Sequence, residues 1–193
     1  MQFKSSTARP GNASRAPGRK LTRSIGPTGR ERTFSEDELI VTKTDLKGRI
    51  TYANDVFLRM AVMSEGEVLG APHSIIRHQD MPRAVFWLLW ETLKSGKEIF
   101  AYVVNLAADG DHYWVFAHVT PSFAPDGSII GYHSNRRTPE RRVLPIVTEI
   151  YAGLKAEEDR HESRARGLEA SIGLLETLLK EKGMPYDEFV FSL

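Results

Sequence analysis

The chain has 193 residues, of which 41% are hydrophobic, and a formal net charge of +1, so it can bury one ordinary hydrophobic core. It contains no cysteine, which excludes disulfides, thiolate metal sites, cysteine nucleophiles and any photosensor whose cofactor forms a cysteinyl adduct. No apolar run approaches the roughly 20 residues that cross a bilayer, and the N-terminus lacks a signal-peptide core, so we expect a soluble cytoplasmic protein.

The N-terminal segment differs in charge from the rest of the chain. Residues 1–35 carry eight Lys or Arg residues against one acid, Glu31, whereas the remainder sums to −6. With three prolines, four glycines and few large apolar side chains, this segment cannot offset its own ordering entropy, so we predict that it is disordered. The segment is either a basic arm that binds nucleic acid or an acidic membrane surface, or it is a solvated leader with no partner. Because basic tails without interleaved aromatics are rarely specific, we favour the leader and expect no nucleic-acid partner.

Short strands and helices follow. Residues 39–44 and 49–53 alternate in hydrophobicity around a turn and are predicted to form a tight β-hairpin. Asn54 then occupies a helix N-cap position, ahead of apolar residues at helical spacing. Ser64 and Glu67 form a capping-box pattern, which predicts a second short helix.

A polar loop precedes the longest helix of this region. Residues 77–82 read Arg-His-Gln-Asp-Met-Pro. A guanidinium, an imidazole and a carboxylate beside a helix start are suited to holding a polar, partly anionic ligand, which is binding chemistry more than catalysis. We predict that the helix begins at Asp80 and ends before Gly96, with Trp87 to the side. Its apolar face consists of Val85, Phe86, Leu89, Trp90 and Leu93.

Three longer strands complete the domain. They are predicted at residues 98–106, 112–123 and 128–138, separated by Asp-Gly turns. The order is therefore two strands, several short helices, one long helix and three strands. This order predicts an α+β domain over residues 36–139.

Several short motifs in this region resemble those of one known family. Residues from about 37 to 139 resemble a PAS domain, and more narrowly the flavin-binding PAS domain of bacterial aerotaxis receptors. The matching segments are Thr44-Asp45-Leu46, Ile50-Thr51-Tyr52-Ala53-Asn54-Asp55, Gly70-Ala71-Pro72-His73, Arg77-His78-Gln79-Asp80-Met81-Pro82, Leu89-Trp90-Glu91-Thr92-Leu93-Lys94, Asn105, Gly110-Asp111-His112-Tyr113-Trp114-Val115 and Gly131-Tyr132. The resemblance implies a five-stranded antiparallel sheet with helices on one face, and FAD in the cleft between them.

The resemblance also implies which residues hold the cofactor. Carried over by position, they are Asn54, Arg77, His78, Asp80 and Trp90. The chemistry of these side chains agrees, because a guanidinium can neutralise a pyrophosphate and an indole can form an aromatic wall. Asn105 adds an amide suited to the edge of the flavin ring, and Trp87 is a further candidate for the wall.

Structural alternatives stand beside these assignments. Asn54 can serve as a helix cap, a ligand contact or both, and Asp80 is an equally reasonable N-cap. Arg77 and Asp80 can instead form an ion pair that fixes the loop to the helix. Trp90 lies on an apolar helix face, where an aromatic residue belongs to the core by default. The family also usually carries a basic run after Asn105, where this chain has Leu-Ala-Ala, which leaves less positive charge near the cofactor's phosphates.

The last segment, residues 140–193, is predicted to be helical. Ten residues from Val147 to Leu179 keep one heptad register, and Gly167 interrupts helical propensity near its middle. Either this segment folds back on the PAS domain as a helix or a hairpin of two, or it forms a seam with a partner or a second copy. The aromatic-rich residues 186–193 are suited to docking in a groove.

Taken with the resemblance, these features predict a cytoplasmic signal-sensing protein that responds to redox state or oxygen through bound FAD. Its output would pass to a partner such as a chemoreceptor or kinase component, and we expect a homodimer. The alternative cofactor is haem, with His73 or His78 as axial ligand. The alternative from another class is a cofactor-free interaction module. We expect neither an enzyme nor a metal site, since the sequence has no phosphate-binding glycine loop, nucleophile elbow or metal-ligand spacing.

Overall fold

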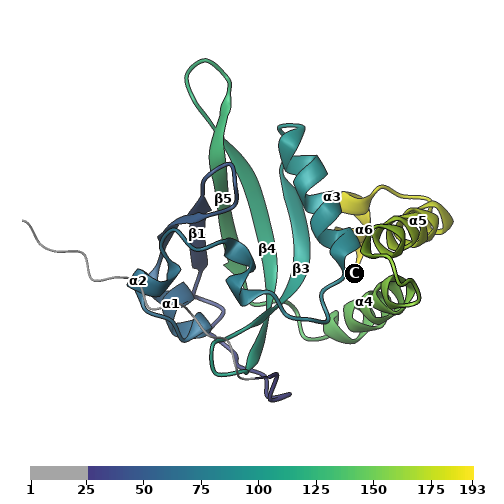
Figure 1. Cartoon of the computed structure of the whole chain (residues 1–193), viewed down its shortest axis with the longest axis horizontal. Coiled ribbons are helices and arrows are strands. Elements are labelled where there is room, and N and C mark those ends of the chain that lie inside the picture. The colour runs from purple at the N-terminus through teal and green to yellow at the C-terminus, as the bar shows by residue number, and fades with distance from the viewer. Residues whose placement is uncertain (1–25) are drawn as a thin grey trace, which may run out of the picture.

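The computed structural model describes residues 26–193 and places one sheet at the centre of the molecule (Figure 1). All neighbouring strands are antiparallel, in the order β2-β1-β5-β4-β3. The strands are β1 (Ile40–Thr44), β2 (Ile50–Ala53), β3 (Ile99–Leu106), β4 (His112–Phe123) and β5 (Ile129–Arg137). The predicted hairpin and the predicted five-stranded antiparallel sheet are confirmed.

The connection from β2 to β3 contains four helices, and the first two have locally encoded N-caps. They are α1 (Asp55–Ala61), α2 (Glu65–Val68), the 3₁₀-helix η1 (His73–Ile76) and α3 (Arg83–Lys94). Asn54 caps α1, since its side chain accepts a hydrogen bond from the Phe57 N–H at 3.1 Å. Ser64 and Glu67 form the predicted capping box of α2.

Helix α3 begins three residues later than predicted, at Arg83 rather than Asp80. Proline lacks an N–H and disfavours helical backbone in the residue before it, so Pro82 marks the boundary as the N-cap. The N–H groups of Arg83 and Ala84 instead donate to the carboxylate of Glu158, at 2.5 and 3.1 Å. A distant acid therefore caps α3. Its negative charge is also favoured there because the N-terminal end of a helix carries partial positive charge.

The two faces of the sheet have different partners. Along β4, Tyr113, Val115 and Ala117 are buried on the face toward α3, and side chains between them point to the opposite face. On that opposite face, the ring of Trp114 lies 6.2 Å from the ring of Tyr151. The core therefore fills one side of the sheet, and the end of the chain covers part of the other.

The C-terminal segment folds back as a helical hairpin followed by a short helix. Helix α4 (Leu144–Asp159) packs against α5 (Arg164–Lys182), and α6 (Tyr186–Ser192) lies along β3. These helices gather beside α3 at the β3 edge of the sheet (Figure 1). The Tyr151 hydroxyl donates to the Tyr102 carbonyl at 2.6 Å, so the hairpin supplies a hydrogen-bond partner to a backbone carbonyl of the edge strand β3. Within residues 26–193, no helix has the length and apolar character of a membrane span.

The heptad register does not form one continuous helix, because the chain leaves helical geometry at residues 161–163. Of the alternatives left open by the sequence, the structure has the folded-back hairpin. Residues of the register that the hairpin buries include Val147, Leu154 and Leu175. Their burial within the chain accounts for the apolar repeat without a second copy.

The disorder predicted through residue 35 is wrong for residues 26–35, while the prediction for residues 1–25 lies outside the described residues. Residues 26–35 run beside the β3–β4 turn, where Arg32 pairs with Asp109 at 2.5 Å. Arg30 and Arg32 also contact Asp111, whose carboxylate is nearly buried. The basic side chains of this segment therefore pair with acids of the domain, which the composition of the segment alone does not reveal.

A glycine pair in α5 tests the packing of the hairpin. A Cβ added to Gly167 would lie 2.4 Å from the Glu158 carbonyl oxygen, whereas one added to Gly173 would meet nothing within 4 Å. We expect Gly167→Ala to lower the free energy of unfolding by about 1–3 kcal/mol through overpacking. Gly173→Ala, the matched control, should raise it by about 0.5–1 kcal/mol because alanine favours helix. Urea denaturation measures both, and equal shifts would contradict the close α4–α5 contact.

Candidate functional site

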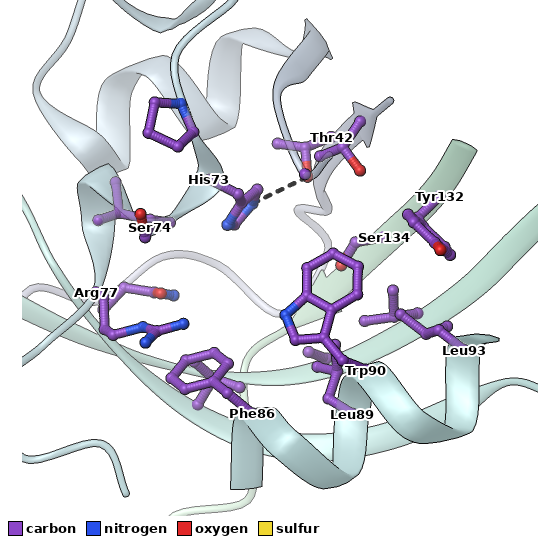
Figure 2. A pocket seen from close by; sticks show the side chains of 18 of the residues that line it. Thr42, His73, Ser74, Arg77, Phe86, Leu89, Trp90, Leu93, Tyr132 and Ser134 are labelled. Atoms are coloured by element: carbon purple, nitrogen blue, oxygen red, sulfur yellow. Dashed lines mark hydrogen bonds between the residues drawn. The ribbon is translucent and has the colours of Figure 1, made fainter. Parts of the chain in front are cut away.

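A cavity of about 260 Å³ lies between α3, η1 and the inner face of the sheet (Figure 2). Helix α3 lines it with four apolar side chains from its predicted apolar face, Phe86, Leu89, Trp90 and Leu93. The sheet contributes both apolar and polar residues, among them Val103, Asn105, Ala117, Val119, Ser134 and Arg136. The space is hollow because small or polar side chains of β3, β4 and β5 face the aromatic wall of α3.

Trp90 forms the wall nearest the β1–β2 turn. Its ring meets the ring of Tyr132 edge-on at 5.3 Å between centroids. Gly48 allows this position, since a Cβ there would lie 3.3 Å from the indole. Gly48 also has φ +71°, which side chains rarely adopt. The turn glycine thus serves both the hairpin and the packing of the aromatic wall.

Four residues that line the cavity have buried polar atoms without a hydrogen-bond partner among the described residues. These atoms are Asn105 Nδ2, Ser134 Oγ, Arg136 Nη1 and Arg77 Nε. Buried polar groups in native proteins are almost always hydrogen-bonded, and each exception calls for a partner such as a ligand or an ordered water. Three of the four are nitrogen donors, so the arrangement suits a ligand that presents hydrogen-bond acceptors.

Arg136 carries its charge inside the domain. The residue is 5% exposed, and its Nη2 donates to Thr42 Oγ1 at 2.8 Å and to His73 Nε2 at 2.6 Å. Burial lowers the pKa of Arg136 to about 10, so the guanidinium remains charged at neutral pH. No described carboxylate forms an ion pair with it. A buried cation without an acid is costly unless a ligand or water supplies the missing acceptors.

His73 is held neutral by burial and, to a smaller extent, by this cation. Burial lowers the pKa of His73 to about 3, and the charge of Arg136 contributes in the same direction. Since Arg136 donates to Nε2, that nitrogen is an acceptor and the proton resides on Nδ1. Figure 2 shows His73 beside Thr42, whose hydroxyl lies 3.3 Å from Nε2. Because Nε2 is already engaged with Arg136, His73 is poorly placed to ligate a haem iron.

The structure brings Arg77, Trp90 and Asn105 together around the cavity, as the sequence predicted. The guanidinium of Arg77 lies over the ring of Phe86, 3.7 Å from its centroid. It forms no ion pair with Asp80, so the alternative of an ion-paired loop is wrong. Arg77 is instead stacked on α3, next to the hollow.

The other four predicted site residues lie outside the cavity lining. Asn54 is fully used in structure, because its side chain bonds the Phe57 and Val41 N–H groups and the Leu39 carbonyl. Trp87 is 37% exposed and points away, since it sits to the side of the apolar face of α3.

His78 and Asp80 belong to the loop before α3 rather than to the cavity. His78 is buried, with its ring 5.8 Å from that of His112, and Nδ1 accepts from the Asp80 N–H at 3.2 Å. The Asp80 side chain is 72% exposed. The imidazole therefore shapes the loop, and the carboxylate meets solvent.

Three residues on the polar side of the cavity, Thr42, Ser134 and Arg136, were not predicted from the sequence. Ser134 and Arg136 alternate with outward-facing residues along β5, and Thr42 occupies the inner face of β1. A period-two pattern that places polar residues on the buried face was the available signal. Most of the predicted site residues instead lie in the helical connection between β2 and β3.

Asn54 and Asn105 should respond oppositely to loss of the amide. Asn54→Ala should lower the free energy of unfolding of the ligand-free protein by about 0.5–2 kcal/mol, since it removes a helix cap. Asn105→Leu should leave it unchanged or raise it by about 1 kcal/mol, since a buried unpaired donor is removed. Thermal and urea unfolding compare the two, and a large loss at Asn105 would show that its amide is already satisfied.

The pH dependence of stability should report the buried imidazole. Between its folded pKa of about 3 and the ordinary 6.5, His73 holds a proton only in the unfolded chain. The free energy of unfolding should therefore fall as pH drops from 6.5 toward 3, with His73 contributing a slope of up to about 1.4 kcal/mol per pH unit. His73→Gln keeps an acceptor for Arg136 and does not titrate, so urea titrations should give it the shallower slope. Identical slopes would contradict a buried, neutral His73.

Comparisons with known proteins agree with this architecture. Residues 50–135 match the sequence profile of a family described as the PAS fold. The chain is 37% identical over 123 residues to the aerotaxis receptor of Escherichia coli (strain K12), covering 64% of the chain and 24% of the receptor. It is 29% identical over 120 residues to the nitrogen fixation regulatory protein of Klebsiella pneumoniae, covering 59% and 24%. The match thus spans about a quarter of the length of these curated relatives.

Solved structures share the fold at low sequence identity. The blue-light photoreceptor Aureochrome1 LOV in its dark state gives a TM-score of 0.51 at 20% identity, covering 57% of this chain and 82% of that one. A light-oxygen-voltage domain described with a flavin analogue gives 0.52 at 18% identity, covering 64% and 90%. The strand order and the sequence match together show that residues 50–135 have the PAS fold, and this part of the chain is similar in sequence to the aerotaxis receptor.

Proposed function

We propose that this PAS domain binds FAD as a sensor of redox state or oxygen and passes the state of the cofactor to a signalling partner. The observation that carries the proposal is the hollow beside Arg136, where Arg136 Nη1, Asn105 Nδ2 and Ser134 Oγ are buried and lack hydrogen-bond partners among the described residues. The similarity to an aerotaxis receptor and the likeness to a domain described with a flavin analogue support the same class of ligand.

The lining of the cavity fits the ring portion of a flavin. An isoalloxazine ring has one edge of carbonyl and ring-nitrogen acceptors and one apolar edge. Asn105, Ser134 and Arg136 would hold the acceptor edge, and Phe86 and Trp90 would contact the apolar surface. The volume of about 260 Å³ lies below the roughly 300–1,000 Å³ of sites for whole drug-sized ligands, so the cavity suits the ring and not the entire dinucleotide.

Arg136 gives the site its electrostatic bias. A bound flavin would undergo reversible reduction, which changes the charge of the flavin ring. A guanidinium in a low-dielectric cavity favours negative charge beside it more strongly than the same group would in water. Arg136 should therefore both strengthen binding and favour the reduced cofactor.

Helix α3 offers a route from the cavity to the end of the chain. Its middle lines the cavity through Phe86 and Trp90, and its N-terminus is held by Glu158 of α4. Glu158 is 2% exposed and also accepts from Arg83 Nε at 2.9 Å. Movement of α3 would therefore disturb its hydrogen bonds to α4, which makes the α4–α5 hairpin the candidate two-state element.

The proposed output is a change in a surface that the hairpin presents, in the cytoplasm, to a chemoreceptor or kinase component or to a second copy of this chain. A role in binding rather than catalysis also belongs to the proposal. Within residues 26–193, no group of three or more His, Asp or Glu side chains is arranged to hold a metal ion. The cofactor-free interaction module is the rival, and its expected signature is a colourless protein.

The absorption spectrum and FAD titration test the proposal. The purified chain, as isolated or reconstituted with FAD, should show flavin bands. Arg136→Met should weaken FAD binding by at least about tenfold and make the reduction potential of bound flavin more negative, since a charged donor is lost. Arg137→Met, the exposed neighbour on β5, is the matched control and should change neither.

Three outcomes would contradict the proposal. A protein that stays colourless and takes up no FAD would favour the interaction module, and a Soret band would instead indicate haem. Unchanged FAD affinity in Arg136→Met would place the flavin away from the cavity.

A further inference from the structure

A second hollow adjoins the cavity and shares one residue with it. This cleft has a volume of about 680 Å³ and lies between the loop before α3 and the turn that joins α4 to α5. Arg77 lines both hollows, so the two meet at this residue. The wall opposite Arg77 comes from the hairpin and includes Lys155, His161 and Arg164, which lie outside the PAS domain.

The cleft contains an excess of unpaired positive charge. Its two acids have partners within the protein, since Glu158 pairs with Arg83 and Asp159 with Lys155. By contrast, neither Arg77 nor Arg164 forms an ion pair with any described acid. Arg77 and Arg164 line the same cleft. Burial lowers the pKa of Arg77, the charge of Arg164 acts in the same direction, and the charge of Glu158 opposes them, so the two cations repel each other.

Like charges held together in this way stabilise an anion placed between them. Guanidinium groups bind phosphate oxygens with paired, charge-assisted hydrogen bonds. The Arg77 Nε atom is buried and lacks a partner, which leaves a donor for such a contact. Helix α5 begins at Arg164, and its N-terminal end adds positive potential on the same side of the cleft.

We propose that the cleft between the loop before α3 and the α4–α5 turn binds the diphosphate of a flavin dinucleotide, with Arg77 and Arg164 as its counter-charges. The inference rests on the proposed function, because the ring-sized cavity leaves the rest of the dinucleotide to be accommodated elsewhere. The volume of the cleft lies within the range for a ligand of nucleotide size. Arg77 then contacts both parts of the ligand from one position.

This assignment makes the hairpin a part of the cofactor site. Arg164 reaches the cleft from α5, and its carbonyl accepts from Arg83 Nη1 at 2.7 Å at the start of α3. The dinucleotide would thus tie α5 to the PAS domain in addition to the Glu158 cap. Riboflavin, which lacks phosphates, would fill the cavity without making this connection.

Titration of the 193-residue apoprotein with riboflavin, FMN and FAD, followed by flavin fluorescence, tests the inference. In the native chain, affinity should rise from riboflavin to the phosphorylated forms. Arg164→Ala should weaken FAD binding by about ten- to a hundredfold and leave riboflavin binding unchanged. Arg166→Ala, an exposed arginine on the same helix, is the matched control and should alter neither. Raising the salt concentration should weaken FAD binding more than riboflavin binding.

The results separate this inference from the proposed function. If riboflavin and FAD both bind but Arg164→Ala leaves FAD affinity unchanged, the phosphates lie elsewhere and only the inference is overturned. Equal loss of riboflavin and FAD affinity would likewise overturn it, since the effect would then act on the ring site or the fold. If the native chain binds no flavin, the proposed function fails and the inference fails with it.

Discussion

The buried guanidinium of Arg136 is the constraint on which the rest of the site depends. It joins β5 to β1 through Thr42 and adds to the effect of burial in keeping His73 neutral at the start of η1. An arginine in a core is normally matched by a carboxylate, whereas this one has neutral partners and an open nitrogen beside a hollow. The domain thus keeps a positive charge where a ligand with acceptor atoms and electron affinity can use it. The stability given up at Arg136, Asn105 and Ser134 is the expected cost of a preformed binding site.

Helix α3 connects this site with the end of the chain. One face supplies the aromatic wall of the cavity, and its first turn is capped by a carboxylate from α4. The close approach of α5 to α4 at Gly167 holds that carboxylate's helix in place. Cavity, α3 and hairpin therefore form one packed series of contacts rather than a sensor joined to a loose extension. A packed interface of this kind tends to shift between discrete arrangements instead of deforming gradually.

Local chemistry made much of this fold predictable. The β1–β2 hairpin, the Asn54 cap and the Ser64–Glu67 capping box depend on residues within a few positions of one another, and they were placed correctly from the sequence. The start of α3 was misplaced because its cap, Glu158, lies 75 residues from Arg83. The heptad register matches the buried residues of α4, whereas in α5 the buried residues are Gly167, Ser171 and Leu175, of which only Leu175 belongs to the register. A hairpin and a coiled-coil seam place similar demands on sequence.

The candidate site was predicted in part for a related reason. Motif resemblance identified Trp90, Arg77 and Asn105, which line the cavity. Asn54 was equally suited to capping a helix and to binding a ligand, and in the structure its amide hydrogen-bonds only to backbone groups. Arg136 and His73 meet only through the pairing of distant segments, 63 residues apart. Their joint effect on charge and protonation is a property of tertiary structure, which neither residue's local sequence contains.

The most direct measurement is a crystal structure of the chain reconstituted with FAD. The account predicts density for the flavin ring between Trp90 and the inner face of the sheet, with its acceptor edge hydrogen-bonded to Arg136 and Asn105. A flavin bound elsewhere, with ordered water alone satisfying Arg136 in the cavity, would contradict it.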